Sequence, residues 1–140
     1  MDRYVDWEAR LSAYLDPLRL MPFEWGRHDC CTFAAGAVYA MTGFDYMAEF
    51  RGRYTTRIGS LRVLKRFGAG ALAPTLDQKF TPIAAATAQR GDIVMSGGAL
   101  GICMGAALIA VGSVGDREGL VLIERAKWDE PFAWAVGRSC

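Results

Sequence analysis

The feature that most constrains the fold of this chain is a change of hydrophobic pattern at Gly91. Before Gly91, apolar residues recur at helical intervals, whereas after it they gather in short runs separated by glycine turns, which is typical of strands. The expected strands are residues 92–95, 100–104, 107–111, 120–123 and 132–136. Helices followed by a run of adjacent strands predict an α+β domain with an antiparallel sheet.

The first expected helix covers residues 6–18. Its apolar residues are three or four positions apart and form one face: Trp7, Leu11, Leu15 and Leu18. Pro17 lies inside this pattern and is expected to end or kink the helix, because proline lacks the amide hydrogen that the helix needs. Residues 22–26 are expected to form a loop.

The second expected helix covers residues 30–41. Asp29 stands where an N-cap would accept hydrogen bonds from the first-turn amides, and Gly43 is the expected stop. The predicted buried stripe is Phe33, Ala37, Val38 and Met41. Several other positions in this helix are small, so we expect a close neighbour, with a sheet as the leading candidate.

Length and composition indicate one globular domain. The chain has 140 residues, of which 52% are hydrophobic and 22% charged. We expect a helical extension at 1–22, a helical half at 29–68 and an antiparallel sheet at 91–137. The net charge of +1 gives no reason to expect nucleic acid as a partner. The first residues do not resemble a secretory signal.

Residues 93–115 contain no charged residue, a length that could cross a bilayer. Six glycines divide this stretch into short apolar pieces. The pattern therefore favours a pair of buried strands, and no membrane span is expected.

The cysteines do not form a standard ligand set. They are Cys30, Cys31, Cys103 and Cys140, and their spacing matches neither a zinc nor an iron–sulfur site. We therefore expect no metal and no cofactor, and a disulfide framework is not expected in a chain without a secretory signal. The pattern assigns no role to Cys31, Cys103 or Cys140.

Residues 25–33, Trp-Gly-Arg-His-Asp-Cys-Cys-Thr-Phe, place Cys30 at the first position of the second helix. Free amides and the helix dipole lower the pKa of a thiol at such a position, so Cys30 is a candidate nucleophile. Asp29 would support it as the N-cap. The alternative is that Cys30 and Cys31 are small residues that pack the helix against a sheet.

The order of several short motifs resembles the NlpC-type papain-like cysteine peptidases, which cut peptidoglycan stem peptides. Residues 25–33 are similar to the family's nucleophile motif, and residues 89–94 to its Gly-Asp-Leu-Val strand. Residues 99–105 are similar to its His-Val-Gly-Ile-Tyr-x-Gly strand. Within this superfamily the chain is most similar to small phage- and prophage-encoded members, which share the motifs at 51–54, 98–101 and 133–134. The resemblance implies a papain-like fold, with helices packed on a small antiparallel sheet.

The same resemblance predicts that the usual partners of the cysteine are missing. The family's catalytic histidine falls on Ala99, and the polar residue that orients it falls near Ala110. His28 is the one histidine of the chain and a weak candidate base, with a solvent-facing or cap-supporting role as the alternative. Glu24, Asp29 and Glu124 are further conceivable partners.

A basic segment precedes and includes a third expected helix at residues 58–67, which Gly68 should end. Its cations are Arg51, Arg53, Arg57, Arg62, Lys65 and Arg66, with no acidic residue between Glu49 and Asp77. One interpretation is a solvated helix face. The other is a docking surface for an acidic partner or a polyanion.

Two functions follow from the resemblance. In the first, the chain is a phage tail-tip-associated cysteine peptidase that acts on peptidoglycan peptides during infection. In the second, it is a catalytically degenerate structural adaptor of the tail tip or baseplate that binds a hub or fibre protein. Either function implies a virion protein that is made in the host cytoplasm.

Overall fold

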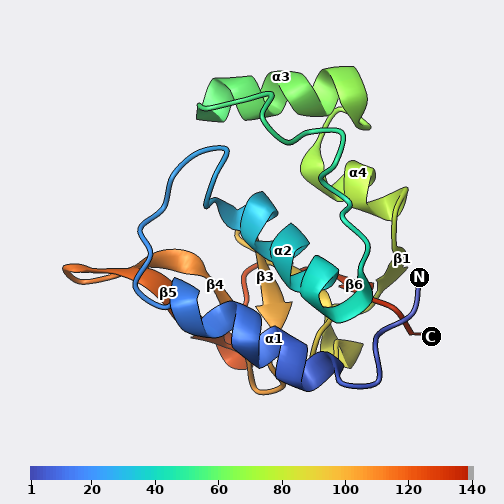
Figure 1. The fold of residues 1–140 in the computed structure, drawn as a ribbon, viewed down its shortest axis with the longest axis vertical. Coiled ribbons are helices and arrows are strands. Elements are labelled where there is room, and N and C mark those ends of the chain that lie inside the picture. The colour runs from blue at the N-terminus through green and yellow to red at the C-terminus, as the bar shows by residue number, and fades with distance from the viewer. Residues whose placement is uncertain (139–140) are drawn as a thin grey trace.

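The computed structural model describes residues 1–138. Within these residues the protein is α+β, as predicted, with helices packed on a six-stranded antiparallel sheet (Figure 1). The helices are α1 (Trp7–Leu15), α2 (Cys30–Thr42), α3 (Arg57–Phe67) and α4 (Leu72–Asp77). The strands are β1 (Thr81–Ile83), β2 (Ile93–Ser96), β3 (Ala99–Cys103), β4 (Ala107–Val114), β5 (Arg117–Glu124) and β6 (Phe132–Ala135), in the sheet order β1-β6-β2-β3-β4-β5.

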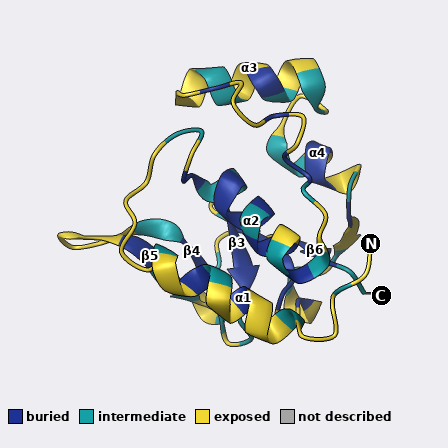
Figure 2. Cartoon of the chain, in the orientation of Figure 1, coloured by how far each residue is buried: buried dark blue, intermediate teal, exposed yellow. Residues whose placement is uncertain are grey.

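Helix α2 is the centre of the core. It contacts α1 on one side and strands β3 and β4 on another, and Figure 2 shows it mostly buried or half-buried. The predicted stripe is confirmed, because Phe33, Ala37, Val38 and Met41 are all fully buried. The small residues have two neighbours rather than the sheet alone. Gly36 lies under the Tyr14 ring of α1, so closely that a Cβ at Gly36 would overlap with the Tyr14 hydroxyl.

Pro17 ends the first helix as predicted. Helix α1 stops at Leu15, and a short 3₁₀ helix at Asp16–Leu18 follows it with Pro17 inside. The β4–β5 hairpin is longer than predicted, since its turn consists of residues 115–116 and pairing continues to Val114 and Arg117. The outer ends of both strands are exposed, so no alternation of burial marks them in the sequence.

Strand β1 and helix α4 have no counterpart among the elements expected from the sequence. Strand β1 contains Pro82 and α4 contains Pro74, and a proline lowers the expectation of either element. Pairing with β6 holds β1 at the edge of the sheet, where a proline is tolerated because one side of the strand has no partner.

The apolar stretch at 93–115 forms β2, β3 and β4 rather than a membrane helix, in line with the strands expected at 92–95, 100–104 and 107–111. Among the described residues, no helix has both the length and the apolar character that crossing a bilayer requires.

Asp92 joins the two ends of the chain. Its buried carboxylate accepts hydrogen bonds from the Arg3 side chain at 3.0 Å, the Val136 amide at 3.2 Å and the Gln89 amide at 2.8 Å. The Arg138 guanidinium also pairs with it. The N- and C-terminal segments therefore meet beside the start of β2 (Figure 1).

Helix α3 stands apart from this core. Figure 1 shows it at the opposite end of the molecule from α1, and Figure 2 shows it mainly exposed. Val63 is its buried residue, whereas Ile58 and Leu61 are exposed. The apolar side chains of α3 are thus only partly covered, because a cavity rather than a packed sheet lies beneath the helix.

Candidate functional site

A tight loop, residues 24–28, lies directly before the start of α2. Glu24 and His28 form an antiparallel bridge, with the His28 amide donating to the Glu24 carbonyl at 2.8 Å. Gly26 at the tip has a positive φ of 83°, and a Cβ there would overlap with the Tyr54 carbonyl oxygen. Glycine is therefore the residue that fits both the turn and the close approach of the neighbouring segment.

Asp29 is the N-cap of α2, as predicted. Its carboxylate accepts from the Thr32 amide at 2.8 Å, and the Thr32 hydroxyl accepts from the Asp29 amide at 2.9 Å, which completes a capping box. The other carboxylate oxygen accepts from the Gly26 amide at 2.9 Å and from the Tyr54 hydroxyl at 2.7 Å. Asp29 is 1% exposed. Its carboxylate is committed to holding the loop, so it is poorly placed to take a proton from a thiol.

Cys30 begins α2, and its pKa lies below the ordinary value of a thiol. The main cause is a hydrogen bond from the Cys31 thiol, whose sulfur lies 4.0 Å away. Hydrogen bonds from the Leu100 and Cys31 backbone amides act in the same direction, while burial acts against them. The pKa of Cys31 is raised well above its ordinary value, first because it donates that bond and then because it is buried. Of the two thiols, Cys30 is therefore the one that ionises more readily.

The two cysteines open into a cavity of about 280 Å³. Helices α2, α3 and α4 enclose it together with the 46–54 segment, and Trp25 and Gly98 also line it. Most of its wall is apolar: Met47, Phe50, Val63, Leu64, Leu72 and Leu76. Arg57 is the cation among the lining residues.

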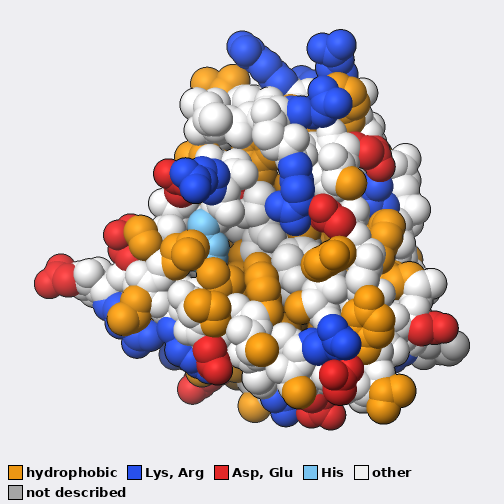
Figure 3. Space-filling view, viewed as in Figure 1, with side chains coloured by type: hydrophobic (Ala, Val, Ile, Leu, Met, Phe, Trp, Pro, Cys, Tyr) orange, Lys and Arg blue, Asp and Glu red, His pale blue; other side chains and the backbone are white. Residues whose placement is uncertain are grey.

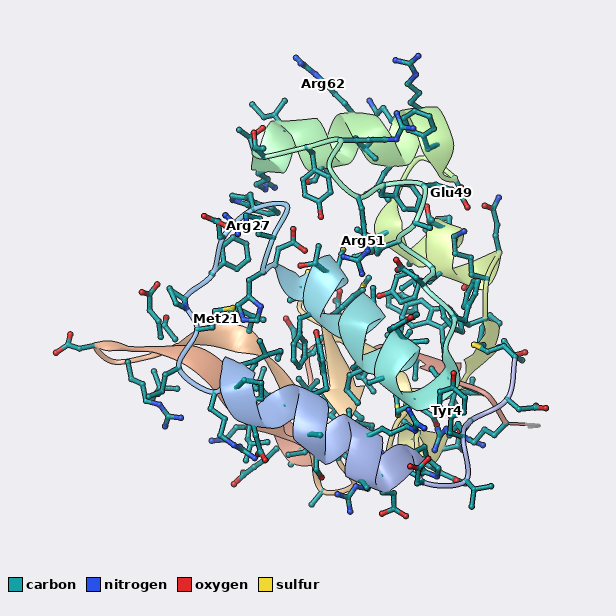
Figure 4. All side chains as sticks on the ribbon, in the orientation of Figure 1. Tyr4, Met21, Arg27, Glu49, Arg51 and Arg62 are labelled. Atoms are coloured by element: carbon teal, nitrogen blue, oxygen red, sulfur yellow. The ribbon has the colours of Figure 1, made fainter. Side chains whose placement is uncertain are left out.

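His28 lies in a different hollow from Cys30. That hollow is formed by α1, the 18–28 loop and α2, and its lining includes Tyr14, Met21, Thr32 and Arg51. Figure 3 shows the histidine side chain in this hollow, and Figure 4 shows Met21 and Arg27 on the adjoining loop. His28 does not line the cavity that contains the two cysteines.

The buried position of His28 excludes the solvent-facing role that the sequence left open. Its ring packs edge-on against Phe33, with the ring centroids 6.3 Å apart, and only 5% of the residue is exposed. Burial lowers the pKa of His28, so the ring is neutral at pH 7. Its Nε2 is buried without a hydrogen-bond partner among the described residues. A neutral imidazole in a separate hollow does not form an ion pair with the Cys30 thiolate.

The two alanines that stand at the expected histidine and orienting positions lie in different surroundings. Ala99 is exposed at the start of β3, directly before Leu100, whose amide bonds the Cys30 sulfur. Ala110 is buried in a second apolar cluster that contains Cys103 but no residue of α2. Alternation along β4 turns Ala110 toward this second cluster and away from the start of α2.

The six basic residues do not form one continuous patch. Arg51 pairs with Asp45 at 2.7 Å and lines the His28 hollow, whereas Arg53 stacks over the Phe67 ring at 4.3 Å. The remaining cations lie on α3: Arg57, Arg62, Lys65 and Arg66. Figure 3 shows them gathered at that end of the molecule, and Figure 4 shows Arg62 pointing away from the body.

Three groups at the site were not singled out from the sequence: the Cys31 thiol, the Tyr54 hydroxyl and the Leu100 amide. The adjacency of the two cysteines was a usable signal for Cys31. The other two act across 25 residues or more of chain, as the Tyr54–Asp29 bond illustrates, so no local pattern marks them. Cys103 lies apart from the site, where Arg125 donates to its sulfur at 3.5 Å. Cys140 lies outside the described residues.

The fold and the site together define an α+β protein in which a cysteine pair begins a capped helix beside an antiparallel sheet. The chain belongs to the family described as a domain of unknown function, DUF6950, which matches residues 2–136. A search of curated proteins gives no match.

Proposed function

We propose that this chain is a phage tail-tip-associated protein with an NlpC-type papain-like fold, and that it acts as a binding adaptor rather than as a peptide hydrolase. The order of elements supports the fold assignment, since a central helix that begins with a cysteine precedes the antiparallel sheet. The Leu100 amide of β3 also donates to the Cys30 sulfur, which places the cysteine beside the start of this strand. A fold alone does not determine an activity, which depends on the residues of the site.

The observation that carries the adaptor function is the separation of Cys30 from a base. Peptide hydrolysis by a thiol needs a group that accepts and then returns a proton to the departing amine. Among the described residues that line the cysteine cavity there is no histidine, and the one carboxylate, Asp29, is occupied by its cap bonds. The Tyr46 and Tyr54 hydroxyls both donate elsewhere.

Helix α3 supplies the docking surface in this proposal. It presents four cations together with the exposed apolar side chains of Ile58 and Leu61. A cationic helix with exposed apolar residues fits an acidic surface with an apolar centre on a hub, baseplate or fibre protein. Docking there would also cover the outer face of the helix that roofs the cysteine cavity.

A pull-down with purified tail components tests the adaptor function. The double variant Arg62→Glu/Lys65→Glu should lose capture of its tail partner, and binding by the wild-type protein should weaken as salt rises. The matched control is Arg19→Glu/Arg27→Glu, which reverses two exposed cations away from α3. If the wild-type protein captures no tail component, or if the control loses as much binding as the α3 variant, the proposal fails.

One observation favours the second function, a peptidoglycan cysteine peptidase. The lowered pKa of Cys30 gives the protein a nucleophile that is ready to react. Hydrolysis of purified cell-wall peptides should be compared between the wild-type protein and Cys30→Ala. Product formed by the wild-type protein above the Cys30→Ala background would establish the peptidase and displace the adaptor proposal, whereas equal background would remove the peptidase.

A further inference from the structure

We propose that Cys30 is an acceptor for acyl groups from acyl thioesters, and that the cavity beneath α3 holds the acyl chain. The proposal deepens the function proposed above, because it rests on the absence of a base from the Cys30 site. It assigns to that site a chemistry that needs no base.

The leaving group decides which acyl donors this site can use. An amide expels an amine, which must receive a proton from an acid in the site. Among the lining residues, the Cys31 thiol donates to Cys30 and the Tyr46 and Tyr54 hydroxyls donate to other groups, so none is free to serve as that acid. A thioester expels a thiolate, which leaves without a proton. Cys31 and two backbone amides lower the pKa of Cys30, so its thiolate forms more readily than that of an ordinary thiol and attack on a thioester needs no separate base.

The step balances without a further reactant. The Cys30 thiolate attacks the carbonyl carbon of the donor, a new carbon–sulfur bond forms at Cys30, and the bond to the donor's sulfur breaks. The electron pair of that bond leaves on the donor thiolate, which takes its proton from water. No atom is oxidised or reduced. Cys31 keeps its proton throughout, which its raised pKa favours.

The cavity selects the acyl chain. Its volume of about 280 Å³ equals roughly nine molecules of liquid water, so a medium-length chain fits better than a long one. Its apolar wall, formed by α3, α4 and the 46–54 segment, rewards burial of methylene groups. Arg57 is the cation of the lining and would favour a donor whose carrier thiol is anionic.

The test uses octanoyl-, decanoyl- and palmitoyl-coenzyme A with the full chain, read by intact-protein and peptide mass spectrometry. We expect one acyl adduct on the peptide that contains Cys30, released by neutral hydroxylamine, and formed faster from decanoyl than from palmitoyl donor. Cys30→Ala should form no adduct at that peptide. An adduct confined to Cys103 or Cys140, or no adduct from any donor, would overturn the proposal.

A cavity-filling variant separates chain binding from simple thiol reactivity. Ser60 lines the cavity from α3, and Ser60→Phe should slow acylation by decanoyl donor about tenfold, the loss expected when two methylenes are no longer buried. Ser113→Phe, the same substitution at an exposed residue outside the cavity, is the matched control and should acylate normally. Iodoacetamide carries no acyl chain and should alkylate Cys30 in both variants at similar rates. Equal acylation of Ser60→Phe and Ser113→Phe would show that the cavity does not hold the chain. The tail pull-down and the peptide-hydrolysis assay are read separately, so failure here is distinct from failure of the proposed function.

Discussion

At the scale of single residues, the site consists of one activated thiol and the groups that hold it. Cys31 and Leu100 both donate to the Cys30 sulfur, whereas the Asp29 cap fixes the loop before it. Reactivity at Cys30 therefore depends on local hydrogen bonds rather than on a distant base. His28, the one histidine, contributes packing against Phe33 instead.

Replacing Cys31 should change the ionisation of Cys30. In Cys31→Ala the bond that contributes most to the lowered pKa of Cys30 is lost, so that pKa should rise and alkylation at pH 7 should slow. Cys31→Ser keeps a donor at the same position and should stay close to wild type. The pH dependence of iodoacetamide alkylation, followed at the Cys30 peptide, measures both variants. Equal profiles for Cys31→Ala and wild type would contradict the role given to Cys31.

His28 should make folding stability depend on pH. Its pKa in the folded protein is lowered by burial from about 6.5, so below that pH the unfolded chain binds a proton that the folded protein does not. The contribution of neutral His28 to the free energy of unfolding is fully present above pH 6.5, and it is lost as the pH drops through 6.5 toward the pKa of the folded protein. Urea unfolding between pH 8 and pH 5 should show this loss in wild type and a smaller one in His28→Gln. The same loss in both proteins would assign the dependence to other groups.

At the scale of elements, the sequence predicts best the helices and strands that bury an apolar face. Helix α2, the stop at Gly43 and the break at Pro17 follow from apolar spacing and local backbone chemistry, and all are found. Strand β1 and helix α4 escape prediction because each contains a proline and is held by contacts distant in sequence. The site was predicted in its local part, Asp29 and Cys30. Its long-range part, Tyr54 and Leu100, was not predicted, because the tertiary fold brings these residues to the start of α2 from distant positions in the sequence.

The contact between α1 and α2 can be tested at Gly36. A Cβ there overlaps with the Tyr14 ring, so Gly36→Ala should destabilise the fold by about 1 to 3 kcal/mol. In a Tyr14→Leu background the overlap is relieved, and the substitution should become neutral or stabilising by up to about 1 kcal/mol because alanine favours a helix. Urea titrations of wild type, Gly36→Ala, Tyr14→Leu and the double variant give the coupling free energy between the two positions. A penalty of the same size in both backgrounds would contradict this packing.

At the scale of the whole molecule, two regions differ in how tightly they are packed. One is the buried Asp92 cluster, which ties the first and last segments together. The other is α3 over the cysteine cavity, with few buried contacts and many cations. The bonds of the first region hold the N- and C-terminal segments together. The second has the low packing that is expected of a surface used for binding.

Asp92→Ala should be among the most destabilising substitutions in the chain. It leaves the Arg3 and Arg138 guanidinium groups without their shared carboxylate, and a loss of about 3 to 5 kcal/mol is expected for a buried pair broken on one side. Asp45→Ala breaks the more exposed pair with Arg51 and should cost less than about 1 kcal/mol. Thermal and urea unfolding compare the two. Similar losses would show that the ends are not held by Asp92.

The most direct test of the central claim, an activated thiol without a base, is the pH profile of Cys30 alkylation in wild type and His28→Gln. We expect one ionisation, below the pH of an ordinary thiol, with the same midpoint in both proteins because His28 lies in a separate hollow. A midpoint that rises in His28→Gln, or a second ionisation that the substitution removes, would show that the histidine and the cysteine act as a pair and would contradict the account.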